Sequence, residues 1–209
     1  MNRGLLRLLH LREQTEAVDA DMIGERARFK RLRKAEAPRA VSAFNLFQTP
    51  PELADCMVAN LPTLGDGSRV LEPSAGLGRL FHAIRRKAPG ALVTLVESSP
   101  DCCAELYRAI DGDESAHLAQ RDFLNFSDLD GFDFIVMNPP FKRGADVKHI
   151  KHARGLLKPG GVLVALCYDG SAQNKHLKPI ADTWTPLGSD LFKTEGTRAA
   201  VVMMTLSTR

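Results

Sequence analysis

The 209-residue sequence contains no apolar run of the roughly 20 residues that are needed to cross a lipid bilayer. The leucine-rich stretch 1–11 is interrupted by two arginines and a histidine and has no small-residue cleavage site, so it predicts a helix and not a signal peptide. The four cysteines lack metal-ligand spacing, and a disulfide between the adjacent Cys102 and Cys103 would be strained. We therefore expect a cytoplasmic protein that has reduced thiols and no membrane association.

What is present is the composition of one globular domain with an appendage, at 44% hydrophobic and 25% charged residues. The net charge of +3 hides an uneven distribution, because residues 26–39 hold seven Lys or Arg against the single acid Glu36. Such a basic segment predicts a polyanionic partner, although a solvated helix face has the same composition. The nucleic-acid contacts predicted in this segment are Arg28, Lys30, Arg31, Arg33 and Lys34.

The pattern of apolar runs divides the chain into a basic helical extension, residues 1–43, and a catalytic domain, residues 44–209. From Arg69 onward strand-like runs alternate with helix-forming stretches, which is typical of a doubly wound α/β fold. The predicted strands are 69–72, 91–97, 117–119, 132–138, 161–167, 190–193 and 198–207, with helices over 77–87, 100–110 and 145–157. A four-residue turn before the last strand permits only antiparallel pairing, so we expect a mainly parallel seven-stranded sheet that ends in an antiparallel hairpin.

The end of the first strand and the turn after it form the first motif, Val70-Leu71-Glu72-Pro73-Ser74-Ala75-Gly76-Leu77-Gly78. Gly76 and Gly78 would let a ligand approach the backbone closely. A dinucleotide fingerprint would need a third small residue where Phe81 stands, so the loop suits a nucleoside ligand without a pyrophosphate. An ordinary strand-to-helix turn is the alternative.

Two further strand ends carry acids that suit the rest of a nucleoside. Glu97, followed by Ser98, closes the second strand, where a carboxylate can accept both hydroxyl hydrogens of a ribose. Asp122 and Phe123 follow the third strand, where an acid can accept from an adenine amine and a ring can pack on the base. As an isolated pair, these two residues are also typical of a turn.

The fourth strand runs into Asn138-Pro139-Pro140-Phe141, in which two prolines restrict the backbone. The Asn138 side-chain oxygen and the Pro139 carbonyl can each accept one hydrogen of a planar amine and so orient its lone pair toward a methyl donor. Phe141 offers a face on which a planar group can stack. The structural alternative is a turn-forming asparagine before a Pro-Pro kink.

A helix start precedes the glycine loop in the stretch Phe47-Gln48-Thr49-Pro50-Pro51-Glu52. Thr49 and Glu52 form a capping-box pattern with Pro50 at the first helical position. The amide hydrogens exposed at such a start favour an anionic carboxylate. A plain cap without a ligand is the alternative.

Together these motifs resemble the class I methyltransferases, and within them the amino-methyltransferases with an Asn/Asp-Pro-Pro-aromatic motif, especially DNA adenine-N6 methyltransferases of phage or restriction-modification type. The resemblance spans residues 44–207 and implies a Rossmann-like fold with S-adenosylmethionine as cofactor. The catalytic residues that it implies are Asn138, Pro139, Pro140 and Phe141. The cofactor contacts that it implies are Gln48, Thr49, Pro50, Glu72, Pro73, Ser74, Ala75, Gly76, Gly78, Glu97, Ser98, Asp122, Phe123 and Asn138.

Basic residues follow the catalytic loop directly, and Lys142, Arg143 and Lys148 are predicted phosphate contacts. We therefore expect methyl transfer to adenine N6, with DNA favoured over RNA. The alternatives are an RNA base amine, a protein glutamine amide, and a non-catalytic subunit that only binds the cofactor. The glutamine enzymes that this chain resembles usually have Tyr where Phe141 stands.

No insertion of domain size interrupts the core, so the sequence offers no separate target-recognition domain. Recognition would then come from the basic extension, from the loops 142–148 and 169–185, from a partner protein or from a second copy of the chain, and we expect short or weak sequence specificity. His149 and His152 lie three residues apart on a predicted helix, but no third ligand is evident. We therefore expect no metal.

Overall fold

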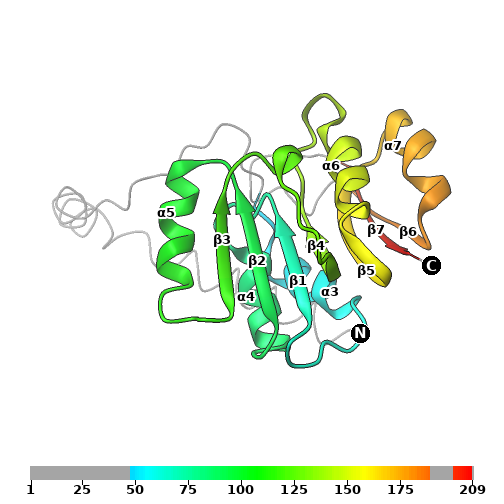
Figure 1. Cartoon of the computed structure of the whole chain (residues 1–209). Coiled ribbons are helices and arrows are strands. Elements are labelled where there is room, and N and C mark those ends of the chain that lie inside the picture. The colour runs from blue at the N-terminus through cyan, green and yellow to red at the C-terminus, as the bar shows by residue number, and fades with distance from the viewer. Residues whose placement is uncertain (1–47, 189–199, 209) are drawn as a thin grey trace, which may run out of the picture. The chain divides into compact units, whose positions relative to one another are not determined.

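The computed structural model describes residues 48–188 and 200–208. Seven strands form one sheet in the order β3-β2-β1-β4-β5-β7-β6 (Figure 1). β1 to β5 are parallel, whereas β7 runs antiparallel to both β5 and β6. The strands are β1 Arg69–Pro73, β2 Leu92–Glu97, β3 Ala116–Gln120, β4 Phe132–Met137, β5 Leu157–Tyr168, β6 Thr183–Gly188 and β7 Val201–Ser207. The predicted fold class is confirmed.

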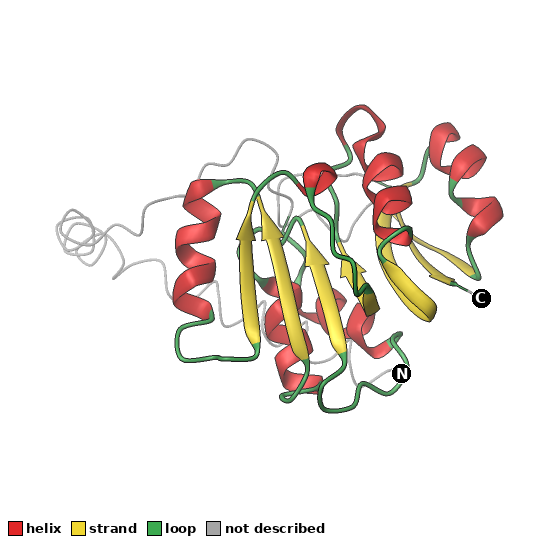
Figure 2. Ribbon diagram, viewed as in Figure 1, coloured by secondary structure: helices red, strands yellow, loops and turns green. Residues whose placement is uncertain are grey.

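Helices cover both faces of this sheet (Figure 2). They are α3 Pro51–Ala59, α4 Arg79–Lys87, α5 Pro100–Ala109, α6 Ala145–Arg154 and α7 Ser171–His176, with short 3-10 turns η1 Phe123–Asn125, η2 Lys142–Gly144 and η3 Lys178–Ile180. α5 begins where the Ser99 hydroxyl accepts the Cys102 amide hydrogen at 3.4 Å, with Pro100 in the first turn. α6 ends three residues before the predicted limit, because Leu157 already pairs with Phe132 as the start of β5.

The antiparallel end of the sheet is present, but its first strand lies earlier in the sequence than predicted. The strand that pairs with β7 is β6, in the register Trp184 with Met204, while the predicted strand 190–193 lies outside the described residues. Pro186 within β6 argues against a central strand, because proline cannot donate to a ladder. β6 is an edge strand, where that missing donor costs little.

The core has two parts because alternate residues of each strand face opposite sides of the sheet. In β1, Val70 packs in the cluster under α3, α4 and α5, whereas Leu71 packs in the cluster that includes Ile150 and Ala153 of α6. β1 is buried on both faces, so its carboxyl end is held firmly from two sides. That end lies between β2 and β4, where the strand order changes direction and where ligands bind in doubly wound sheets.

Among the helices of the described ranges, none is both long and apolar enough to cross a membrane. The proposed domain boundary at residue 43 and the basic residues from Arg28 to Lys34 lie outside the part of the chain that the structure describes.

Candidate cofactor and substrate site

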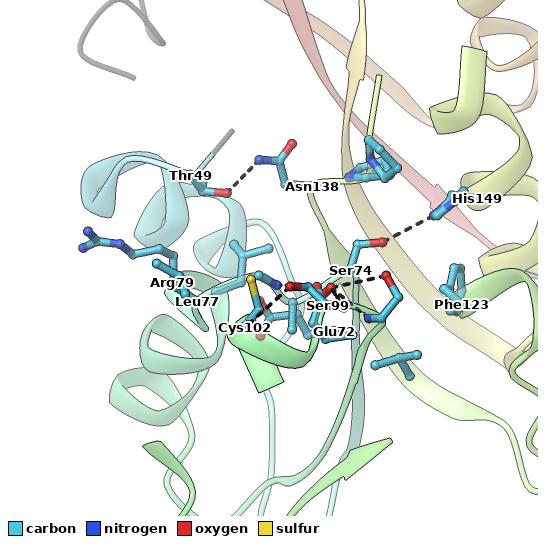
Figure 3. Close-up of a pocket in the computed structure, with 18 of the residues that line it drawn as sticks. Thr49, Glu72, Ser74, Leu77, Arg79, Ser99, Cys102, Phe123, Asn138 and His149 are labelled. Atoms are coloured by element: carbon cyan, nitrogen blue, oxygen red, sulfur yellow. Dashed lines mark hydrogen bonds between the residues drawn. The ribbon is translucent and has the colours of Figure 1, made fainter. Parts of the chain in front are cut away.

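A pocket of about 430 Å³ opens at the carboxyl ends of β1, β2, β3 and β4 (Figure 3). Its volume falls within the roughly 300–1,000 Å³ that is common for sites of small organic ligands. The pocket brings together most of the predicted site residues, which are Gln48, Thr49, Glu72, Ser74, Ala75, Gly76, Glu97, Ser98, Asp122, Phe123, Asn138, Pro139 and Pro140. Residues from four strand ends and from the segment before α3 therefore share one cavity, although they range from Gln48 to Pro140 in the sequence.

Four of the predicted catalytic and cofactor residues do not line this pocket, namely Pro50, Pro73, Gly78 and Phe141. Gly78 has a packing role, since it adopts a left-handed φ of 76° and a Cβ there would lie 2.9 Å from a methyl carbon of Leu106. The Phe141 side chain is half-buried and packs against the core cluster under α3, α4 and α5. Its use as a stacking face for a substrate therefore remains a prediction.

Glu97 is the acid at the end of β2, and the backbone around it is arranged to hold its carboxylate. One oxygen accepts the Gly76 amide hydrogen at 2.9 Å, and the other accepts those of Ser98 and Ser99 at 2.8 Å each. Gly76 can donate because it turns there with a φ of 56°. The glycine loop and the second strand end are thus joined through one carboxylate, which lines the pocket and has one acceptor site left on Oε2 for a ligand.

Glu72, at the end of β1, is 2% exposed and faces the backbone N–H groups of Leu80 and Phe81 in the first turn of α4. Burial raises the pKa of this carboxyl well above its usual value, an effect that these two amides oppose and the charge of Glu97 reinforces. Among the described residues, its buried Oε2 has no hydrogen-bond partner. A cationic ligand group in the pocket would supply that partner and favour the ionised carboxylate.

The catalytic loop is connected to the start of α3. The Asn138 amide nitrogen donates a hydrogen bond to the Thr49 hydroxyl at 3.1 Å, which leaves the amide oxygen as the acceptor end of the side chain. The predicted capping box is wrong in this respect, because Pro50 occupies the N-cap position without a side-chain hydrogen bond and Pro51 begins the helix. Thr49 is buried against Asn138 and so is unavailable as a cap.

Sequence reasoning missed several lining residues, of which His149 contacts two of the predicted ones. Its ring nitrogen lies 3.4 Å from the Ser74 hydroxyl and its ring centroid lies 5.6 Å from that of Phe123. Burial lowers the pKa of this imidazole, with Asp122 acting in the opposite direction. The other missed residues are Leu77, Arg79, Leu80, Val96, Ser99, Cys102 and Arg121. Ser99 was the one with a signal, since a serine before proline after a strand is a common helix start.

His149 and His152 do not converge on one point. The His152 ring nitrogen Nε2 lies 2.8 Å from the Phe126 carbonyl oxygen, whereas the His149 ring faces Ser74. In the ranges that the structure describes, no three His, Cys, Asp or Glu side chains gather as a metal site.

The methyltransferase small domain family model matches residues 52–184, which include five of the seven strands in full and every lining residue of the pocket except Gln48 and Thr49. The chain belongs to this family. It is an S-adenosylmethionine-dependent methyltransferase, and S-adenosylmethionine is its cofactor. No curated protein matches the chain in sequence.

Solved methyltransferases share this fold. TrmN from Thermus thermophilus superposes with a TM-score of 0.60 at 18% identity over 76% of this chain and 49% of its own. The 23S rRNA methyltransferase ErmE gives 0.59 at 18% identity over 78% and 70% of the two chains. The glycopeptide N-methyltransferase MtfA, solved with S-adenosylmethionine bound, gives 0.56 at 14% identity over 81% and 99%. At these identities the likeness establishes the fold, and the methyltransferase spans about half of the length of TrmN.

The residues present in the pocket fit this cofactor. The unpartnered Oε2 of Glu72 suits the ammonium group of the methionine moiety, and the Glu97 carboxylate suits ribose hydroxyls. Asp122 is exposed beside the buried ring of Phe123, at the position predicted for the adenine. The methyltransferase therefore offers complementary groups for the ammonium, ribose and adenine parts of the cofactor.

Proposed function

We propose that this methyltransferase transfers the methyl group to an exocyclic amine of a nucleic-acid base, with adenine N6 in DNA as the leading target. The observation that carries the proposal is the position of Asn138 and Pro139 in the same pocket as Glu72 and Glu97. Acceptor groups for an amine thus share a cavity with the groups that suit the methyl donor. The hydrogen bond to Thr49 orients the Asn138 amide for this use.

S-adenosylmethionine supplies a methyl group on a positively charged sulfur, so an amine nitrogen can displace the thioether directly. The protein then needs to orient the amine and exclude water, which are positioning effects. In our proposal the Asn138 amide oxygen and the Pro139 carbonyl each accept one amine hydrogen, and the two prolines keep these acceptors in place. A base in a duplex would have to leave the stack to reach them, with Phe141 as its stacking face.

Charge supports a nucleic-acid substrate. The stretch from Lys142 to Lys178 carries seven exposed cations that form no ion pair among the described residues, and we call them the α6–α7 cations. They are Lys142, Arg143, Lys148, Lys151, Arg154, Lys175 and Lys178. Free surface cations attract phosphates, and releasing the counterions of the nucleic acid favours binding. We propose that the basic extension, residues 1–43, adds contacts to those of the domain 44–209.

RNA is the second candidate, because one structural neighbour is a 23S rRNA methyltransferase. The Asn-Pro-Pro-Phe motif, with its resemblance to DNA adenine-N6 enzymes, is what favours DNA. A protein glutamine substrate gives no reason for the α6–α7 cations, and it is also disfavoured by the phenylalanine at position 141.

The test is methyl transfer from radiolabelled S-adenosylmethionine to unmethylated DNA, to RNA and to a protein extract, assayed in parallel with the full chain. We expect label in DNA that is recovered as N6-methyladenine. Label confined to RNA would support the second candidate, and label in protein would contradict a nucleic-acid substrate. Cofactor binding without any transfer would identify a non-catalytic subunit.

A further inference from the structure

Tyr168 is an exposed aromatic residue at the same edge of the sheet as the catalytic loop. It is the last residue of β5, and its side chain is 42% exposed. β5 pairs with β4 in the register Met137 with Ala165, so β5 continues three residues beyond the end of β4, whereas Asn138 follows directly after Met137. Tyr168 does not line the pocket described above, so a group that contacted its ring would lie outside that pocket.

The backbone of Tyr168 is held by a buried carboxylate. The Tyr168 amide hydrogen is donated to Asp146 of α6 at 2.9 Å. Asp146 is fully buried and also accepts from the Gln173 side chain of α7, at 2.9 and 2.8 Å to its two oxygens. One carboxylate therefore ties the end of β5 to both neighbouring helices, and a buried, fully hydrogen-bonded group of this kind fixes local geometry.

The ring of Tyr168 lies over the backbone of Gly170. A Cβ at position 170 would meet two ring carbons of Tyr168 at 2.9 and 3.1 Å, so a side chain there would displace the ring. The contact positions one part of the ring and leaves the rest in solvent. An aromatic ring that is held but uncovered is a surface on which a planar partner can stack.

The charge of the chain on both sides of Tyr168 suits a polyanion. From residue 142 to 178 the two acids are Asp146, which is buried, and Asp169, whose carboxylate accepts from Asn174 at 3.3 Å. The α6–α7 cations lie on both sides of Tyr168 in the sequence, and α6 packs against α7. Exposed aromatic rings among unpaired cations are the typical surface for a single strand of nucleic acid.

We propose that Tyr168 contacts the substrate by stacking on the base next to the methylated one, while the α6–α7 cations hold the phosphates of that strand. The neighbouring base is the partner because the ring lies outside the pocket that takes the target. This inference rests on the proposed function, and it makes Tyr168 a determinant of substrate affinity and of sequence context at one flanking position.

The experiment compares the full-length protein with Tyr168→Ala, Tyr168→Phe and Tyr168→Trp on an oligonucleotide with one target. We expect Tyr168→Ala to raise the KM for the oligonucleotide about 10-fold, since a stacked base contributes on that scale. Phe and Trp keep a stacking face and should stay near wild type. The dissociation constant of S-adenosylmethionine should not change, which also reports that each variant is folded.

The control is Tyr107→Ala, because Tyr107 is the other of the two tyrosines of the chain and is 53% exposed on α5. A sharper probe is an oligonucleotide with an abasic site on one or the other side of the target. On one side of the target, the abasic site should raise the KM of the wild type about as much as Tyr168→Ala does. The two increases in KM should not add when the variant is tested on that oligonucleotide.

Three results would each overturn the role of Tyr168. They are an unchanged KM for Tyr168→Ala, an equal increase in KM for Tyr107→Ala, and increases from Tyr168→Ala and the abasic site that add fully. In those cases a wild type that methylates nucleic acid would leave the proposed function standing. A wild type that methylates no nucleic acid at all would overturn both proposals.

Discussion

The two halves of the carboxyl edge of the sheet carry opposite charge. The ends of β1, β2 and β3 place three acids, Glu72, Glu97 and Asp122, around the pocket, against the two cations Arg79 and Arg121. The ends of β4 and β5 carry the amide of Asn138 and the ring of Tyr168, followed by the α6–α7 cations. This difference shows how one edge of a sheet can bind two ligands at different places. A cationic cofactor is attracted to the first half, and an anionic substrate is attracted to the second.

The ion pairs of the basic residues differ between the two halves in a similar way. In the half that contains α4 and α5, Arg85 pairs with Asp113 at 2.6 Å and Arg86 pairs with Asp55 at 2.5 Å. In the half that contains α6 and α7, Lys158 pairs with Asp133, and no other described cation from Lys142 to Lys178 has such a partner. Arg85 and Arg86 thus join elements of the fold, whereas the α6–α7 cations remain available to a ligand. Substitutions in the two halves should therefore have separable effects.

The largest effect on the cofactor half is expected from Glu97→Ala. The change removes the acceptor for the ribose and leaves the amides of Gly76, Ser98 and Ser99 without their partner. We predict that the dissociation constant of S-adenosylmethionine rises about 100-fold, as expected for the loss of two hydrogen bonds to a charged group. Calorimetric titration checks this. Glu105→Ala, which removes an exposed acid of α5, is the control and should bind normally.

Glu72→Gln should weaken cofactor binding about 10-fold, as expected for the loss of one charged partner, and should also change how stability depends on pH. Burial raises the pKa of Glu72, so in the window between its unfolded and folded values the folded state binds the extra proton, and stability falls as pH rises through that window. Above this window the carboxylate is ionised in both the folded and the unfolded state, and the loss of stability is complete. The glutamine variant has no carboxyl group to ionise at this position, so it does not lose stability in this way. Without cofactor, its thermal midpoint should exceed that of the wild type by more at pH 8 than at pH 4.

Differential scanning fluorimetry across this pH range, with and without S-adenosylmethionine, measures both effects. A glutamine variant with the same pH dependence as the wild type would show that the protonation of Glu72 contributes nothing to stability.

On the boundary between the halves, Thr49→Val removes the acceptor that orients the Asn138 amide. We predict a kcat about 10-fold lower, as expected for the loss of one hydrogen bond, with little change in substrate KM. Thr49→Ser retains the hydroxyl and should restore most of the rate. Equal kcat values for the valine and serine variants would indicate that this hydrogen bond does not position the amide.

The smallest effect belongs to the substrate half. Lys148→Gln should raise the KM for nucleic acid a few-fold and reduce the salt slope of binding by about 1, because one phosphate contact is lost. The matched control is Arg86→Gln, which removes a cation that is already paired. If both variants lowered the salt slope equally, the contrast between free and paired cations would have no bearing on binding.

The fold could be predicted largely from the sequence, because the central strands contain short apolar runs that are buried on both faces, such as Ile135, Val136 and Met137 of β4. Strand β6 could not, since it lies at an edge and contains Pro186. The predicted site residues mostly meet in one pocket because the carboxyl ends of parallel strands converge. The partners of Thr49 and His149 were out of reach, since they are side-chain contacts between segments 89 and 75 positions apart.

The central claim is that Asn138 orients an amine of a nucleic-acid base for methylation, and the Asn138→Ala variant tests it most directly. The measurement is single-turnover transfer to unmethylated DNA with S-adenosylmethionine above its dissociation constant, and the product is identified by mass spectrometry. We predict N6-methyladenine from the wild type and a rate at least about 100-fold lower from the variant, because a misplaced amine alone costs that much, while cofactor affinity persists. A variant that methylates DNA at the wild-type rate would contradict the account.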